Sequence, residues 1–225
     1  CNNIFTFVKR IILYIIIPII FIFTFLINCS GSTPTIGEKT EDKKPVLTKE
    51  QKGKKALEYF INGSVFETQG NYEAAVGQYE KALIYDSSAG LYYTLAKNYV
   101  YLNKLSSALN YSLKSVELDS TKIEYYDLLA DIYSYGKQSE SAIATLEKAI
   151  KLDSLNIELN YKLARLYEDD KPVKAVKLYN RILSQVGADW SVLTRIAELQ
   201  ERLGNSDEAI DALKKLLAID PANIP

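Results

Sequence analysis

The chain has 225 residues, of which 48% are hydrophobic and 24% are charged, and its formal net charge at pH 7 is −1. It contains no His, the commonest general base and metal ligand, and its two Cys stand at positions 1 and 29. With no nucleophile motif and no glycine-rich phosphate loop either, we expect no enzyme, no cofactor and no metal site. Residues 1–55 carry +5, so the remainder carries −6, which argues against nucleic-acid binding.

The first expected element is an apolar segment over residues 1–29. Residues 11–27 hold no charge and follow Lys9 and Arg10. A helix of 17 residues spans about 26 Å, which fits either a short membrane span or a long signal-peptide core. Basic residues before the apolar run keep the N-terminus in the cytoplasm and send the rest across the membrane.

The end of this segment, LINCSGS over residues 26–32, resembles the lipobox of bacterial lipoproteins. Leu26 is the aliphatic residue three positions before Cys29, although Asn28 stands where the family has Gly, Ala or Ser. The resemblance implies cleavage before Cys29 and its lipidation, and Ser30 implies sorting to the outer membrane. An uncleaved single-span anchor is the alternative, and both place the chain on the bacterial envelope, facing the periplasm or exterior.

Residues 30–55 form the second expected segment, a tether rich in Ser, Thr, Pro, Gly and Lys. Because so few apolar residues cannot offset the entropy of ordering, we predict that it is disordered. Its basic stretch over residues 49–55 has a second interpretation, contact with anionic lipid head groups.

Small residues recur every 33 or 34 positions across residues 56–223. One set is Gly63, Ala96, Ala130, Ala164 and Ala197, and the other is Ala75, Ala108, Ala142, Ala175 and Ala209. Apolar residues flank both sets at helical spacing, on either side of a short polar turn such as residues 70–72. The period predicts five stacked helix pairs, over about 56–88, 89–122, 123–156, 157–188 and 190–223. The two small residues of a pair should face each other where its helices cross, so larger side chains would push the helices apart.

These units resemble the tetratricopeptide repeat. An aromatic follows the first small residue by one turn in four units, at Phe66, Tyr99, Tyr133 and Tyr167. A bulky residue follows the second by one turn, at Tyr79, Leu146, Tyr179 and Leu213. Gln200 and Ser112 depart from this pattern, and the fourth unit lacks one residue in its internal turn near residues 169–172, where Pro172 would fit the first turn of a helix.

The resemblance implies an all-α, right-handed solenoid of about five helix pairs, whose first helices line a concave groove for a peptide or protein partner. The groove residues that it implies are Tyr93, Lys97, Tyr101, Asp127, Asp131, Tyr135, Tyr161, Arg165, Arg195 and Glu198. Family members that clamp a partner's terminal carboxylate need Lys and Asn where this chain has Phe60 and Ser64, so that partner class is not expected.

We therefore expect a non-catalytic interaction scaffold tethered to the envelope, with no nucleic-acid or small-molecule ligand. The alternative is a structural subunit of an envelope machine for pilus assembly, outer-membrane assembly or polysaccharide export, held by an uncleaved transmembrane helix. The chain has no Met, and residues 220–225 read as a linker into another helix, so we expect the natural chain to be longer. The last pair lacks a polar cap, so we expect further chain or a partner to cover it.

Overall fold

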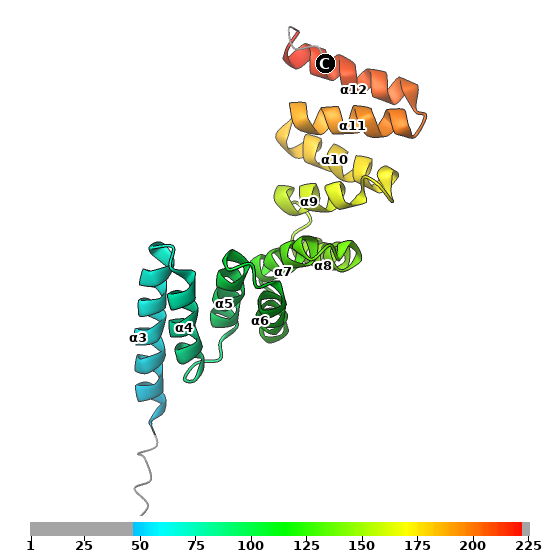
Figure 1. Ribbon diagram of the computed structural model, residues 1–225. Coiled ribbons are helices and arrows are strands. Elements are labelled where there is room, and N and C mark those ends of the chain that lie inside the picture. The colour runs from blue at the N-terminus through cyan, green and yellow to red at the C-terminus, as the bar shows by residue number, and fades with distance from the viewer. Residues whose placement is uncertain (1–46, 222–225) are drawn as a thin grey trace, which may run out of the picture. The chain divides into compact units, whose positions relative to one another are not determined.

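The computed structural model describes residues 47–221, which contain ten α-helices and no strand (Figure 1). The helices are α3 (Lys49–Thr68), α4 (Tyr72–Leu83), α5 (Ala89–Tyr101), α6 (Leu105–Leu118), α7 (Ile123–Tyr135), α8 (Ser139–Leu152), α9 (Ile157–Tyr167), α10 (Pro172–Val186), α11 (Trp190–Arg202) and α12 (Ser206–Ile219). The predicted all-α fold is confirmed. The expected anchor, its Cys29 and most of the expected tether lie outside the described residues. None of the helices within residues 47–221 is long and apolar enough to cross a membrane.

The first helix begins earlier than the sequence suggested. The Thr48 side chain accepts a hydrogen bond from the Gln51 N–H (3.2 Å), and the Gln51 side chain accepts one from the Thr48 N–H (2.9 Å). This reciprocal capping box starts α3 at Lys49, and an ion pair between Lys54 and Glu50 (2.7 Å) supports its first turns. Residues 49–55, expected to be disordered tether, are therefore helical. Apolar content underestimated them, because capping and helix propensity stabilise a helix without a buried face.

The helices follow one another in pairs, and we call α3, α5, α7, α9 and α11 the first helices and the others the second helices. Each second helix packs against the first helix of its own pair and against the first helix of the next pair (Figure 1). The recurring small residues are buried at these contacts. Gly63 shows the constraint most sharply, because a Cβ atom there would lie 2.7 Å from the Tyr79 ring.

Four of the five pairs are joined by a three-residue turn whose middle residue has a left-handed backbone. These residues are Gly70, Asn103, Lys137 and Gly204, with φ between 54° and 76°. A left-handed residue after a helix satisfies its last carbonyl groups and turns the chain back. Two of the four turns therefore use a residue with a side chain where glycine would be least strained.

The fourth pair departs from the others. Its first helix, α9, ends three residues after Ala164, whereas the first helices of the other pairs continue for five residues after their small residue. The connection to α10 has four residues instead of three. The missing residue thus shortens the helix and not the turn, which corrects the sequence prediction. Pro172 occupies the first turn of α10, as predicted.

The buried apolar residues form two clusters along the array. We call the one built on α4 and α5, with Tyr59, Phe66 and Tyr111 packed against it, the N-terminal core. The other extends from Tyr126 on α7 to Ala212 on α12, and we call it the C-terminal core. Between them, α6 buries Ser112 and Ser115, where the other second helices bury larger or apolar side chains. The Ser112 hydroxyl has no hydrogen-bond partner within the described residues.

Candidate partner-binding groove

The largest pocket lies between the first helices of the first three pairs. It has a volume of about 840 Å³ and apolar or aromatic walls, which include Leu57 and Phe60 on α3, Leu91 and Tyr93 on α5, and Tyr125 on α7. Its rim carries charges of both signs, at Lys49, Asp86, Lys122 and Glu124. This size and composition are typical of pockets that accept apolar side chains of a ligand.

A second pocket of about 350 Å³ adjoins the first and shares Phe60 and Thr94 with it. It is lined by Glu67, Lys97 and Tyr101, among others. We call the two pockets together the N-terminal groove. All three groove residues predicted for the second pair line it: Tyr93 in the larger pocket, and Lys97 and Tyr101 in the smaller.

Aromatic pairs stiffen the walls of the N-terminal groove. The rings of Tyr93 and Tyr125 lie 5.1 Å apart, and those of Tyr72 and Tyr101 are stacked at 4.5 Å. Such pairs restrict their side chains while leaving ring faces exposed. Tyr101 remains 56% exposed, so part of its apolar surface is available to a ligand.

The floor of the smaller pocket is a hydrogen-bonded cluster around Glu67. Its carboxylate binds the Lys97 ammonium (2.7 Å) and accepts hydrogen bonds from the Tyr79 hydroxyl (2.8 Å) and the Asn98 amide (3.0 Å). Burial by itself would raise the pKa of Glu67, but these three hydrogen bonds outweigh it and hold that pKa below its usual value. The hydrogen bond to Glu67 raises the pKa of Lys97, so both groups are charged at neutral pH.

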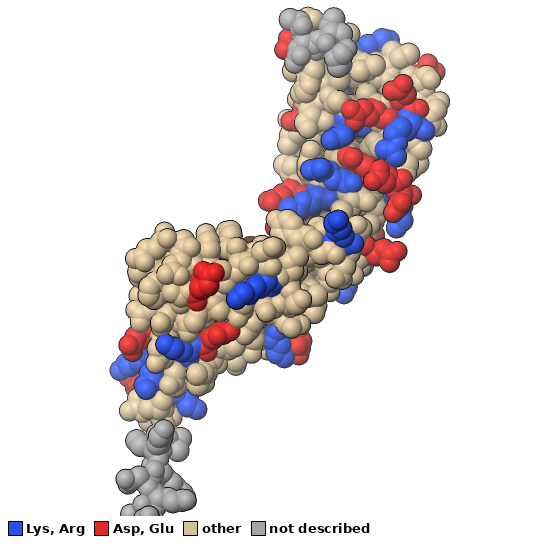
Figure 2. Space-filling model, viewed as in Figure 1, with Lys and Arg blue, Asp and Glu red and all other residues tan. Residues whose placement is uncertain are grey.

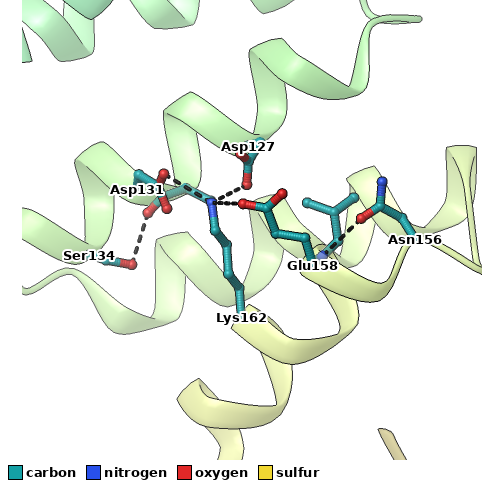
Figure 3. A network of polar contacts seen from close by, with 8 residues as sticks. Asp127, Asp131, Ser134, Asn156, Glu158 and Lys162 are labelled. Atoms are coloured by element: carbon teal, nitrogen blue, oxygen red, sulfur yellow. Dashed lines mark hydrogen bonds and ion pairs between the residues drawn. The ribbon is translucent and has the colours of Figure 1, made fainter. Parts of the chain in front are cut away.

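The predicted groove residues of the third pair lie in a different environment. Figure 3 shows the Lys162 ammonium on α9 between Asp127 and Asp131 of α7, at 2.6 and 3.0 Å, with Glu158 at 3.5 Å. Burial would lower the pKa of Lys162, but the hydrogen bonds from its ammonium to Asp127 and Asp131 raise it overall. Burial raises the pKa of Asp131 in spite of Lys162. The two aspartates therefore tie α7 to α9 in this structure.

A similar contact joins the fourth and fifth pairs. Glu168 accepts a hydrogen bond from the Tyr179 hydroxyl (2.5 Å) and faces Arg195 of α11 at 3.8 Å. Arg195 also binds Glu198 on its own helix at 3.1 Å. The two residues predicted for the fifth pair are thus paired with each other and with the fourth pair.

The three remaining predicted residues lie on the surface or beside it. Tyr135 is 61% exposed, Arg165 is exposed, and Tyr161 packs edge-on against Tyr179 at 5.8 Å. None of the three lines the N-terminal groove. Their assignment to partner binding stays a prediction.

Sequence reasoning missed Glu67, Lys162 and Glu168, each the centre of a cluster. A signal was present, because Lys162 precedes Ala164 by two residues as Arg195 precedes Ala197. Charge is also unevenly distributed over the visible face. Figure 2 shows acidic and basic side chains crowded over α9–α12 and sparse over α3–α7.

Comparison with known proteins agrees with this architecture. The family model of the tetratricopeptide repeat matches residues 89–122, 123–154 and 191–223, which fall in the second, third and fifth pairs. No curated protein sequence matches the chain.

Solved structures similar to the chain are tetratricopeptide-repeat proteins or share their fold. A MamA crystal structure is 26% identical, with a TM-score of 0.68 over 77% of this chain and 100% of that one. YrrB, described as a TPR protein with an unusual peptide-binding site, is 19% identical, with a TM-score of 0.65 over 77% and 91%. PilF of Pseudomonas aeruginosa is 20% identical, with a TM-score of 0.60 over 77% and 80%. The chain therefore carries tetratricopeptide repeats, and its described helix pairs form a solenoid of the tetratricopeptide-repeat type.

Proposed function

We propose that the chain is a non-catalytic scaffold that binds an extended peptide segment of a partner protein in the N-terminal groove. The observation that carries this proposal is the continuous, aromatic-walled space over α3, α5 and α7, which offers apolar pockets beside a charged floor. Tetratricopeptide repeats generally serve protein–protein interaction, and YrrB is described as having a peptide-binding site.

The proposal locates the binding site in one half of the array. In the other half, Asp127, Asp131 and Arg195 are held in contacts between neighbouring first helices. A ligand there would have to displace ion pairs that are already formed, whereas in the larger pocket of the N-terminal groove it would cover apolar surface that is exposed to water. The partner segment that fits best carries bulky apolar or aromatic side chains.

We also propose that this scaffold is held on the outer side of a bacterial membrane, in the periplasm or at the cell exterior. The sequence supports this through the apolar run of residues 11–27 and the lipobox-like residues ending at Cys29. The intact mass of the chain extracted from membranes tests the anchor. A mature chain that begins at Cys29 and carries acyl groups is expected, and residues 1–28 still attached would contradict lipidation.

Two tyrosines at equivalent repeat positions provide the test of the groove. Tyr101 and Tyr135 each lie five residues after their small residue and are 56% and 61% exposed, but only Tyr101 lines the N-terminal groove. In capture from envelope extract with the full chain, Tyr101→Ala should lower recovery of the partner at least about fivefold, the loss of one interface anchor. Tyr135→Ala should recover it as the wild type does. Equal recovery with both variants would contradict the proposed groove.

A further inference from the structure

The last second helix, α12, exposes apolar positions that the other second helices cover. They lie one, four and eight residues after Ala209, and they are Ile210 (48% exposed), Leu213 (40%) and Leu217 (42%). In the other four pairs, the residue four positions after the equivalent alanine is at most 1% exposed. Those residues lie beside the first helix of the following pair, which packs against each of these second helices.

Beside this apolar row lies a cleft of about 350 Å³ between α11 and α12. Its walls combine Ile210 and Leu213 with the side chains of Glu198 and Glu201. We call Ile210, Leu213, Leu217, Glu198 and Glu201 the terminal face. It therefore presents an apolar row next to two carboxylates.

Within the array, two helices show what covers such a face. Both α9 and α11 carry an aliphatic residue, two others, a basic residue, an aliphatic residue and alanine, as LNYKLA over residues 159–164 and VLTRIA over residues 192–197. Their four aliphatic residues are 5% exposed or less and belong, except for Leu193 and its neighbours on the outer side, to the C-terminal core. The basic residue of each, Lys162 or Arg195, reaches an acid on the preceding first helix.

The acids of the terminal face occupy the same repeat positions as those internal acceptors. Glu198 follows Ala197 by one residue, as Asp131 follows Ala130. Glu201 follows Ala197 by four residues, as Glu168 follows Ala164. The terminal face thus repeats both the apolar and the acidic parts of an interface that the molecule already forms twice.

We propose that the terminal face binds one amphipathic helix of a partner protein, with the pattern aliphatic-x-x-(Lys or Arg)-aliphatic-Ala. The two aliphatic residues cover Leu213 and its apolar neighbours, and the basic residue binds Glu198 and Glu201. This surface is separate from the N-terminal groove, so it gives the scaffold a second docking site.

A second copy of the chain does not supply this helix. Its own α9 and α11 are already packed inside the array. The first helix α3 has Glu58 and Asn62 where the pattern requires aliphatic residues, and both are exposed. Stacking α3 of one copy on α12 of another would therefore place polar groups against Leu213 and Leu217, which is unfavourable.

The test uses the full chain in detergent solution and a fluorescein-labelled peptide with the sequence of residues 189–205. A hydrocarbon staple on the peptide's polar side removes the entropic cost of forming an isolated helix. Fluorescence anisotropy should show binding to the wild type, and Leu213→Glu should weaken it at least tenfold. Ile84→Glu is the matched control, because Ile84 is 74% exposed and lies outside the terminal face, and it should leave binding unchanged.

A charge reversal tests the acidic half of the face. Glu201→Lys should weaken binding of the peptide about threefold or more and should strengthen binding of a peptide carrying Arg195→Glu. No binding by the wild type, or equal binding by Leu213→Glu, would overturn the proposal. Self-association of the chain that is lost in Leu213→Glu and unaffected by the peptide would also overturn it, since a second copy would then be the occupant.

Discussion

The two halves of the array use the same repeat positions for different purposes. In the first three pairs, the inner positions of the first helices carry Phe60, Tyr93 and Tyr101, which leave an aromatic groove open. In the last three pairs, the corresponding surface carries Lys162 and Arg195, which bind acids on the preceding first helix. A repeat scaffold thus separates a binding surface from a self-bonded surface by changing side chains alone.

The hydrophobic cores divide in the same region. The N-terminal core lies beneath the groove, and the C-terminal core lies beneath the ion pairs, with buried serines of α6 between them. Because each pair contacts only its neighbours, the stability of one half depends weakly on the other. Substitutions should therefore act locally, and each prediction below tests that separation.

The largest effect is expected from Gly63→Ala in the N-terminal half. The new Cβ atom would lie 2.7 Å from the buried Tyr79 ring, so the free energy of unfolding should fall by about 1–3 kcal/mol. Gly77→Ala makes the same change in α4 with open space around it, and it should stabilise by up to about 1 kcal/mol. Hydrogen exchange should show the loss of protection in α3–α5 only. Equal loss across α9–α12 would contradict independent halves.

Lys162→Met tests the C-terminal half. It would leave Asp127 and Asp131 as neighbouring half-buried carboxylates without their cation, so about 1–2 kcal/mol of stability should be lost. Lys148→Met, at an exposed site on α8, should change stability by less than about 0.5 kcal/mol. Denaturant titration measures both variants. Peptide capture by the N-terminal groove should be the same in both, and a lower capture by Lys162→Met would show coupling between the halves.

Ser112→Ala addresses the junction between the two cores. It removes a buried hydroxyl that has no partner within the described residues, so stability should rise by about 0.5–1.5 kcal/mol. Ser115→Ala is the control, because the Ser115 hydroxyl donates to the Ser112 carbonyl oxygen at 2.7 Å. The control should not stabilise the protein, and thermal unfolding that shows equal gains for both would contradict this account.

The smallest expected effect is a pH dependence in the groove floor. The pKa of Glu67 is lower in the folded chain than its usual value of 4.5, so its contribution to stability is present above that value and is lost as the pH falls through the folded pKa. Glu67→Gln should therefore lose less stability than the wild type between about pH 5 and about pH 3. Glu58→Gln changes an exposed acid of the same helix and should follow the wild type. Parallel curves for Glu67→Gln and the wild type would contradict the cluster.

The sequence by itself determined the fold class and the number of helix pairs. Small residues at a fixed period can only serve repeated helix crossings, so the positions of Ala96, Ala130 and their equivalents predicted the stacking directly. The groove residues of the second pair also followed from the repeat, because Tyr93, Lys97 and Tyr101 keep their repeat positions on the groove side of α5.

Only the tertiary structure decided how those side chains are used. Whether Asp131 is open to a partner or bound depends on Lys162, which lies 31 residues away in sequence and reaches it because α7 and α9 are neighbours in space. The start of α3 and the shortened α9 depended on local hydrogen bonds that apolar periodicity does not report. Periodicity records which residues must be buried, whereas contacts between charged and aromatic groups depend on which helices the fold brings together.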